Sequence, residues 1–226
     1  MSSIPGHLRV GGVAVVAMLL LTGCAGLRPG TAVQVGDEQI TADEIDDVTT
    51  QFCAALEEPL NQQAQTIPHG YFRGGIAGVL ALREVAEQVA ADYGVEADTD
   101  EYRQQLADLR SQAGSLPQSQ QEAVIAVESG PFYVEAIRAA VGEELLDGEG
   151  EESEFETAGE EEMQRWIDDN GVEFDPALNT TIRDGQVAPA DGSLSFAVSE
   201  GAKAGLEEQP NSALAATLPD SQRCGR

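Results

Sequence analysis

The sequence predicts an α+β fold, mainly α with a small β element and about six helices. Apolar residues recur at helical spacing through the middle of the 226-residue chain. Apolar and polar residues instead alternate in short stretches near both of its ends. Because a lone strand is not stable, we expect the N-terminal strand at 33–35 to pair with a short C-terminal strand at 172–174 or 194–198.

The first 23 residues have the organisation of a signal peptide. The apolar stretch from Val10 to Thr22 is too short for a transmembrane helix, which needs about 20 residues. Leu21 to Cys24 reads Leu-Thr-Gly-Cys, the lipobox pattern of bacterial lipoproteins, in which the cysteine takes a diacylglycerol. We therefore expect lipidation at Cys24, a tether over 24–31 and a location on the extracytoplasmic face of the cell membrane. The alternative is an ordinary secretory signal with an incidental cysteine.

The charge of the chain excludes one class of partner. The chain carries 40 acidic and 12 basic residues, a formal net charge of −28, and every acidic residue lies after Cys24. Such a surface repels phosphate backbones and anionic lipid heads. We therefore expect no nucleic-acid partner, and the membrane is contacted only through the lipid anchor at Cys24.

With Cys24 assigned to the lipid, two cysteines remain, Cys53 and Cys224. A pair of cysteines in an oxidising compartment favours a disulfide. This disulfide would close a loop of about 170 residues and could contribute up to about 5 kcal/mol through loop entropy. The alternative is that Cys53, which lies near the apolar stripe of its helix, is a buried free thiol.

The helical domain is expected to span 32–198 and to begin with the strand at 33–35. Thr41, with Glu44 three positions later, has the pattern of a helix capping box. The first helix should then end at Pro59. Four more helices are predicted from apolar stripes and helix-breaking residues: 76–94, Asp98 to Gly114 with Asp98 as the cap, one opened by Pro117 and broken by Gly130-Pro131, and one that carries Tyr133 to Leu145.

The polar, glycine-rich stretch 61–75 between the first two helices is predicted to be a loop. It contains two aromatic residues, Tyr71 and Phe72, between glycines. These residues are candidates for binding a partner through an exposed apolar patch. The alternative is that the loop tucks both aromatic rings onto the core.

The C-terminal part of the chain begins with a run of acids. Eleven acidic residues and no basic residue lie from Glu143 to Glu162, and we interpret 147–157 as an acidic linker that could also bind calcium weakly. A sixth helix is expected at about 160–169, followed by the short strands. The final residues, 199–226, have few apolar side chains and are predicted to be a flexible tail.

The residues that support common catalytic chemistry are few. After Cys24 there is one histidine, His69, so no zinc-ligand spacing exists, and no Gly-x-Ser-x-Gly motif is present. We therefore expect no enzyme activity, no catalytic residues, no metal site and no cofactor.

One stretch resembles a known family. Val33 to Ile45, with the sequence VQVGDEQITADEI, resembles the start of the SurA and PrsA family of extracytoplasmic chaperones, where a strand leads through an Ile-Thr cap into the first helix. Gly36-Asp37 stands where that family often has Asn-Gly. The resemblance extends over about 32–198 and implies binding of unfolded, exported polypeptides. The interval at 147–157 has no room for a parvulin domain, so prolyl isomerase activity is not expected.

These observations favour a membrane-anchored chaperone that holds exported polypeptides in a shallow apolar groove between helices. The alternative is a structural lipoprotein that docks one specific envelope partner. The sequence does not predict an oligomeric state.

Overall fold

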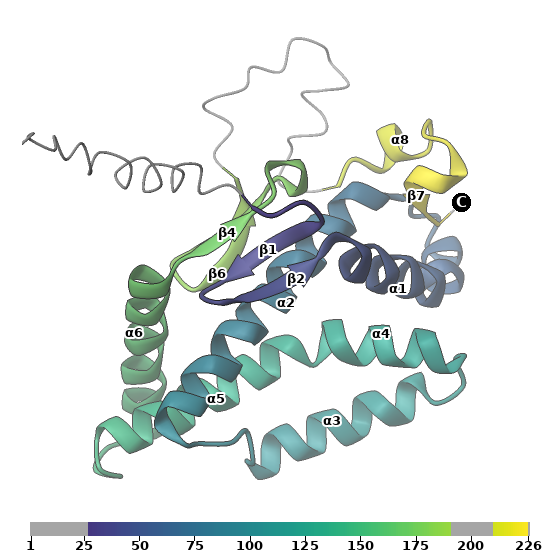
Figure 1. Cartoon of the computed structure of the whole chain (residues 1–226). Helices are drawn as coiled ribbons and strands as arrows, with labels where there is room; N and C mark the ends of the chain where they lie inside the picture. Colours follow the sequence, from purple (N-terminus) through teal and green to yellow (C-terminus); the bar gives the residue numbers. More distant parts are fainter. Residues whose placement is uncertain (1–26, 191–209, 226) are drawn as a thin grey trace, which may run out of the picture.

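The computed structural model describes residues 27–190 and 210–225, and it confirms the predicted fold class (Figure 1). The helices of the described part are α1 (Ala42–Gln62), α2 (His69–Tyr93), α3 (Asp100–Ala113), α4 (Gln118–Glu128), α5 (Gly130–Leu145), α6 (Glu152–Asn170) and the short α8 (Ser212–Ala215). The strands are β1 (Thr31–Val35), β2 (Glu38–Thr41), β3 (Ile67–Pro68), β4 (Val172–Phe174), β5 (Thr180–Arg183), β6 (Gln186–Pro189) and β7 (Arg223–Cys224). Two 3-10 turns, η1 (Pro176–Leu178) and η3 (Asp220–Gln222), complete the order.

Strand β1 is the middle strand of a three-stranded antiparallel sheet with the order β2-β1-β4. Val33 faces Phe174 and Val35 faces Val172 in the β1–β4 register. The predicted pairing of the N-terminal strand with 172–174 is therefore confirmed. The strand predicted at 194–198, the signal peptide at 1–23 and Cys24 lie outside the described residues.

Helix α2 is the central helix of the molecule. It contacts α1, α4, α5, α6, β1 and the β5–β6 hairpin. Its buried residues form much of the core and are Gly74, Ile76, Ala77, Gly78, Ala81, Leu82, Val85, Ala86, Val89 and Ala90. Burial of one apolar side chain contributes about 1.5–3 kcal/mol, so this helix organises the hydrophobic core.

The first helix begins as predicted and ends later than predicted. The Thr41 hydroxyl accepts a hydrogen bond from the Glu44 N–H at 3.2 Å, as an N-cap requires. The prediction that Pro59 ends the helix is wrong, because α1 continues to Gln62. A proline in the last turn removes a single N–H donor, and Leu60, buried in this turn, anchors it to the core.

The loop predicted at 61–75 is also wrong over most of its length. Residues Ile67–Pro68 form β3, and α2 begins at His69. The glycines in this stretch lower helix propensity, which is why the sequence pattern favours a loop. Packing reverses that preference, because Gly74 lies against the Leu178 carbonyl and a Cβ at that position would be 2.6 Å from its oxygen.

The acidic linker predicted at 147–157 is wrong from Glu152 onwards, because α6 begins there. Glu151 and Glu154 form a capping box at the start of this helix. Acidic side chains in a first helical turn are favoured by the helix dipole. The high density of carboxylates therefore stabilises a helix N-terminus here, and the connection from α5 shrinks to 146–151.

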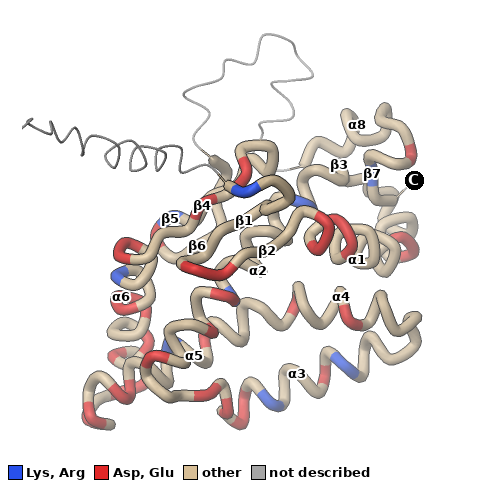
Figure 2. Tube along the Cα trace, viewed as in Figure 1, with Lys and Arg blue, Asp and Glu red and all other residues tan. Residues whose placement is uncertain are grey.

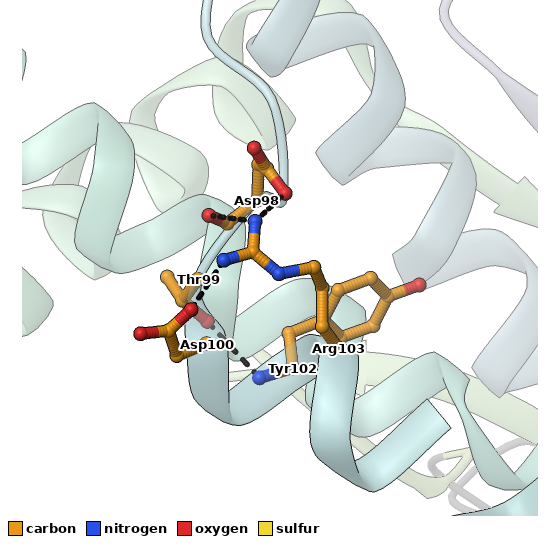
Figure 3. Close-up of polar contacts among 5 residues, drawn as sticks. All are labelled: Asp98, Thr99, Asp100, Tyr102 and Arg103. Atoms are coloured by element: carbon orange, nitrogen blue, oxygen red, sulfur yellow. Dashed lines mark hydrogen bonds and ion pairs between the residues drawn. The ribbon is translucent and has the colours of Figure 1, made fainter. Parts of the chain in front are cut away.

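The third helix starts one residue later than predicted. Thr99, and not Asp98, is its N-cap, since the Thr99 hydroxyl accepts from the Tyr102 N–H at 3.1 Å. Figure 3 shows that Asp98 instead pairs with Arg103, which also contacts Asp100. These hydrogen bonds raise the pKa of the Arg103 guanidinium. They also pair the exposed charges at the start of α3 with one another.

The C-terminal residues 210–225 are not the flexible tail that the sequence predicts for 199–226. They form α8, η3 and β7, and β7 pairs antiparallel with β3. The Cys53–Cys224 disulfide joins this segment to α1, with the Cα atoms 5.4 Å apart and a sequence separation of 171. This predicted disulfide is confirmed, and the alternative of a free Cys53 thiol is wrong.

Candidate functional site: an apolar cleft between α2, α5 and the β5–β6 hairpin

A cleft of about 340 Å³ lies where the β5–β6 hairpin meets α2 and α5. Its residues come from three separate parts of the chain, which the fold brings together. They are Val79 and Leu82 of α2, Gly130, Pro131, Val134 and Arg138 of α5, Gly185 of the hairpin turn, and Gln186 and Val187 of β6. We call this set of residues the hairpin cleft. Its volume is at the lower end of the range of about 300–1,000 Å³ that is typical of ligand sites.

Glycines on the helices determine how closely the walls of the hairpin cleft approach one another. A Cβ at Gly78 would lie 2.3 Å from Cγ1 of Val187, and one at Gly130 would lie 2.5 Å from Cγ1 of Val79. Both distances are far below an ordinary carbon contact of about 3.5–4.0 Å. The β5–β6 hairpin can therefore lie directly on α2 only because Gly78 has no side chain. Helix α5 can likewise lie directly beside α2 only because Gly130 has none.

The rim and floor of the hairpin cleft differ in exposure. Pro131 and Gln186 are exposed, whereas Leu82 and Val134 are 9% and 6% exposed and belong to the core. A ligand can thus reach the cleft from solvent and contact apolar side chains continuous with the core. The cleft has room for one or two apolar side chains of a bound molecule.

Arg138 is the charged residue of the hairpin cleft. Its Nη2 donates to the Gly185 carbonyl at 2.9 Å, and its Nε is buried without a hydrogen-bond partner in the described part of the chain. Glu160 of α6 approaches the same turn, 3.4 Å from the position that a Cβ of Gly185 would take. No described acid, Glu160 included, forms an ion pair with Arg138. The cleft therefore combines apolar walls with a cation that has no ion-pair partner among the described residues.

This cation contrasts with the rest of the surface. Figure 2 shows acidic residues along β2, the helices and their ends, and far fewer basic ones. Several of the other arginines are neutralised locally, as Arg73 is by Asp46 and Arg83 by Glu87. Arg138 is thus a local positive group in a strongly acidic molecule.

The two aromatic residues proposed from the sequence lie outside the hairpin cleft. Both are on the first turn of α2 and not in a loop. Phe72 packs edge-to-face against Phe52, with the ring centroids 5.6 Å apart, whereas the Tyr71 side chain is 45% exposed. The alternative, in which the aromatic rings pack onto the core, therefore holds for Phe72 and not for Tyr71. Their role in binding a partner stays a prediction.

His69 begins the same helix. Burial lowers the pKa of its imidazole, Asp46 opposes that shift and Arg73 adds to it. No acid lies in the first turn of α2, and the positive end of the helix dipole disfavours a second positive charge there. His69 is therefore a neutral side chain at neutral pH.

No described group of three or more His, Cys, Asp or Glu side chains could hold a metal ion. None of the described helices is both long and apolar enough to span a membrane. Cys24, the proposed lipidation site, is outside the described residues.

Sequence reasoning missed Arg138 and the hairpin cleft as a site. The available signal was an arginine beside the apolar stripe of Val134, Ile137 and Val141, together with glycines at positions 74, 78 and 130. Neither pattern identifies a partner surface until the hairpin is placed against α2. Comparison of the chain with known protein families, curated proteins and solved structures finds no match.

Proposed function

We propose that this protein is a chaperone-like lipoprotein that binds unfolded, exported polypeptides in the hairpin cleft and has no prolyl isomerase activity. The observation that carries the proposal is the solvent-accessible apolar cleft, whose floor is formed by Leu82 and Val134. Unfolded chains expose apolar side chains that folded proteins bury. A site for one or two such side chains can recognise many different clients.

The size of the hairpin cleft also indicates the strength of binding. A cleft of about 340 Å³ accepts only a small part of a client, so the buried apolar area is small. At roughly 25 cal/mol per Å² of apolar surface, and after the entropy of ordering an unfolded chain, little net free energy remains. We expect weak, rapidly reversible binding, which suits a protein that holds and releases clients.

The proposed location is the extracytoplasmic face of the cell membrane, with a lipid anchor at Cys24. Two features support it: the Leu-Thr-Gly-Cys pattern ending at Cys24, and the Cys53–Cys224 disulfide, since disulfides persist in oxidising compartments. The resemblance of Val33 to Ile45 to SurA and PrsA proteins supports the same assignment. Strand β1 begins at Thr31, so only a short tether separates it from Cys24.

The proposal is tested by the aggregation of a chemically denatured exported protein after dilution. The purified protein should slow the rise in light scattering. Pro131→Glu should weaken this effect, because it places a carboxylate on the cleft rim at a helix N-terminus that tolerates acids. Pro117→Glu makes the same change at the exposed N-cap of α4, away from the cleft, and should leave the activity intact. Equal behaviour of the native protein and a buffer control would refute the proposal.

A structural lipoprotein that docks one envelope partner is the competing function. Crosslinking in intact cells separates the two. Many partners at low yield support a chaperone, whereas one dominant, stoichiometric partner supports the docking protein.

A further inference from the structure

Arg138 gives the hairpin cleft a chemical preference that apolar walls alone would not. A guanidinium has five N–H donors, and one of the donors of Arg138 reaches the Gly185 carbonyl. Its Nε is buried and unpaired in the described part of the chain. Arg138 lines the cleft and no described acid forms an ion pair with it, so its positive charge has no partner there, and a carboxylate is the acceptor that a guanidinium binds best. An apolar ligand with a carboxylate would therefore fit the cleft better than a neutral one.

The strand beside the hairpin cleft favours an extended polypeptide as that ligand. Strand β6 pairs with β5 alone among the described strands, so its other edge has no strand partner there. Gln186 and Val187 of β6 line the cleft. An unpaired strand edge offers backbone donors and acceptors to an extended peptide, whereas a fatty acid has no backbone to use them.

We infer that the hairpin cleft binds the C-terminal end of a polypeptide whose last side chains are apolar, with its terminal carboxylate on Arg138. This inference rests on the proposed function and specifies which part of a client is held. A free C-terminus places a carboxylate directly beside the last side chain. An internal segment of a polypeptide has no terminal carboxylate. An internal Asp or Glu does have a carboxylate, but its own side chain would then occupy the space beside Val79, Leu82 and Val134 that an apolar side chain would otherwise fill.

The direct test compares one peptide in two forms. A short synthetic peptide ending in two leucines is labelled at its N-terminus and made with either a free C-terminal carboxylate or a C-terminal amide. Binding to the purified protein is followed by fluorescence anisotropy. We expect the free acid to bind about tenfold more tightly than the amide, which corresponds to about 1.4 kcal/mol.

Variants then assign that difference to one residue. In Arg138→Gln the acid and the amide should bind within about twofold of each other, because the remaining side chain has no charge. Arg110→Gln removes the same charge from the exposed end of α3 and should keep the tenfold preference. Arg138→Lys retains the charge without the planar fork and should keep an intermediate preference. If Arg138→Gln fails to fold, as judged by circular dichroism, the preference for the acid over the amide is compared between Arg138→Lys and the native protein. A smaller preference in Arg138→Lys supports the inference, and an unchanged preference overturns it.

The outcomes separate this inference from the proposed function. Equal binding of acid and amide by the native protein overturns the inference and leaves polypeptide binding in place. An unchanged preference in both Arg138 variants also overturns it. If neither peptide binds and unfolded clients are not protected from aggregation, the proposed function fails as well. If dodecanoate binds the native protein and no peptide does, the site is one for fatty acids and the inference is overturned.

Discussion

At the scale of single residues, two glycines hold α5 and α6 together. A Cβ at Gly142 would lie 1.8 Å from the Phe155 carbonyl oxygen, and one at Gly159 would lie 1.9 Å from that of Arg138. Each helix thus presents a glycine to the backbone of the other. The contact at Gly159 also holds the backbone of Arg138 in place, and the Arg138 side chain lines the hairpin cleft.

Gly159→Ala should therefore lower the free energy of unfolding by about 1–3 kcal/mol, the usual range for overpacking. Urea unfolding followed by circular dichroism measures it. Gly75→Ala is the control, because Gly75 is exposed on α2 and the added Cβ would have no atom within 4 Å apart from its chain neighbours and the backbone of its own helix. It should stabilise the protein by about 0.5–1 kcal/mol, since alanine is the better helix former. Changes of the same sign in both variants would contradict the proposed α5–α6 contact.

His69 should give stability a pH dependence. Burial holds its pKa below the ordinary value of about 6.5, so the unfolded chain takes up the proton at a higher pH than the folded chain. The resulting contribution is fully present above about pH 6.5 and is lost as the pH falls through that value towards the lower folded pKa. His69→Gln should therefore lose less stability than the native protein between about pH 7 and pH 5 in urea unfolding. Identical losses would exclude this role of His69.

At the scale of elements, the structure follows the sequence pattern where local signals agree with packing. The alternation of Val33 and Val35 and the Thr41 cap both predict what is observed. The start of α2 could not be predicted, because its glycines look like loop residues until the hairpin lies on them. The start of α6 was hidden for another reason: its acids look like a solvated linker, although the helix dipole and a capping box stabilise them there.

The C-terminal segment, 210–225, is joined to the rest of the molecule by one covalent bond and by noncovalent contacts. The disulfide between Cys53 and Cys224 closes a long loop, and residues 210–225 otherwise attach through short elements such as the two-residue pairing of β3 with β7. The double variant Cys53→Ser, Cys224→Ser should lower the free energy of unfolding by about 2–5 kcal/mol. Amide hydrogen exchange should also accelerate in 210–225 more than in α2. Unchanged exchange in 210–225 would show that the noncovalent contacts suffice.

At the scale of the whole molecule, the fold class could be predicted and the candidate site could not. Periodicity reports which face of an element is buried, and that information was enough for a helical domain closed by strands from both ends of the chain. The hairpin cleft depends on tertiary placement, because Val79, Arg138 and Val187 come from three elements. The Cys53–Cys224 disulfide and the acidic composition support the proposed export, and in the proposed function the hairpin cleft is the place where a client binds.

The central claim is that unfolded polypeptides bind in the hairpin cleft. The most direct measurement is an NMR titration of the methyl-labelled protein with an unfolded exported polypeptide. The predicted result is a set of shift changes concentrated on Val79, Leu82, Val134 and Val187, with fast exchange. An absence of shift changes, or changes confined to the region around Tyr71 and Phe72, would contradict the claim.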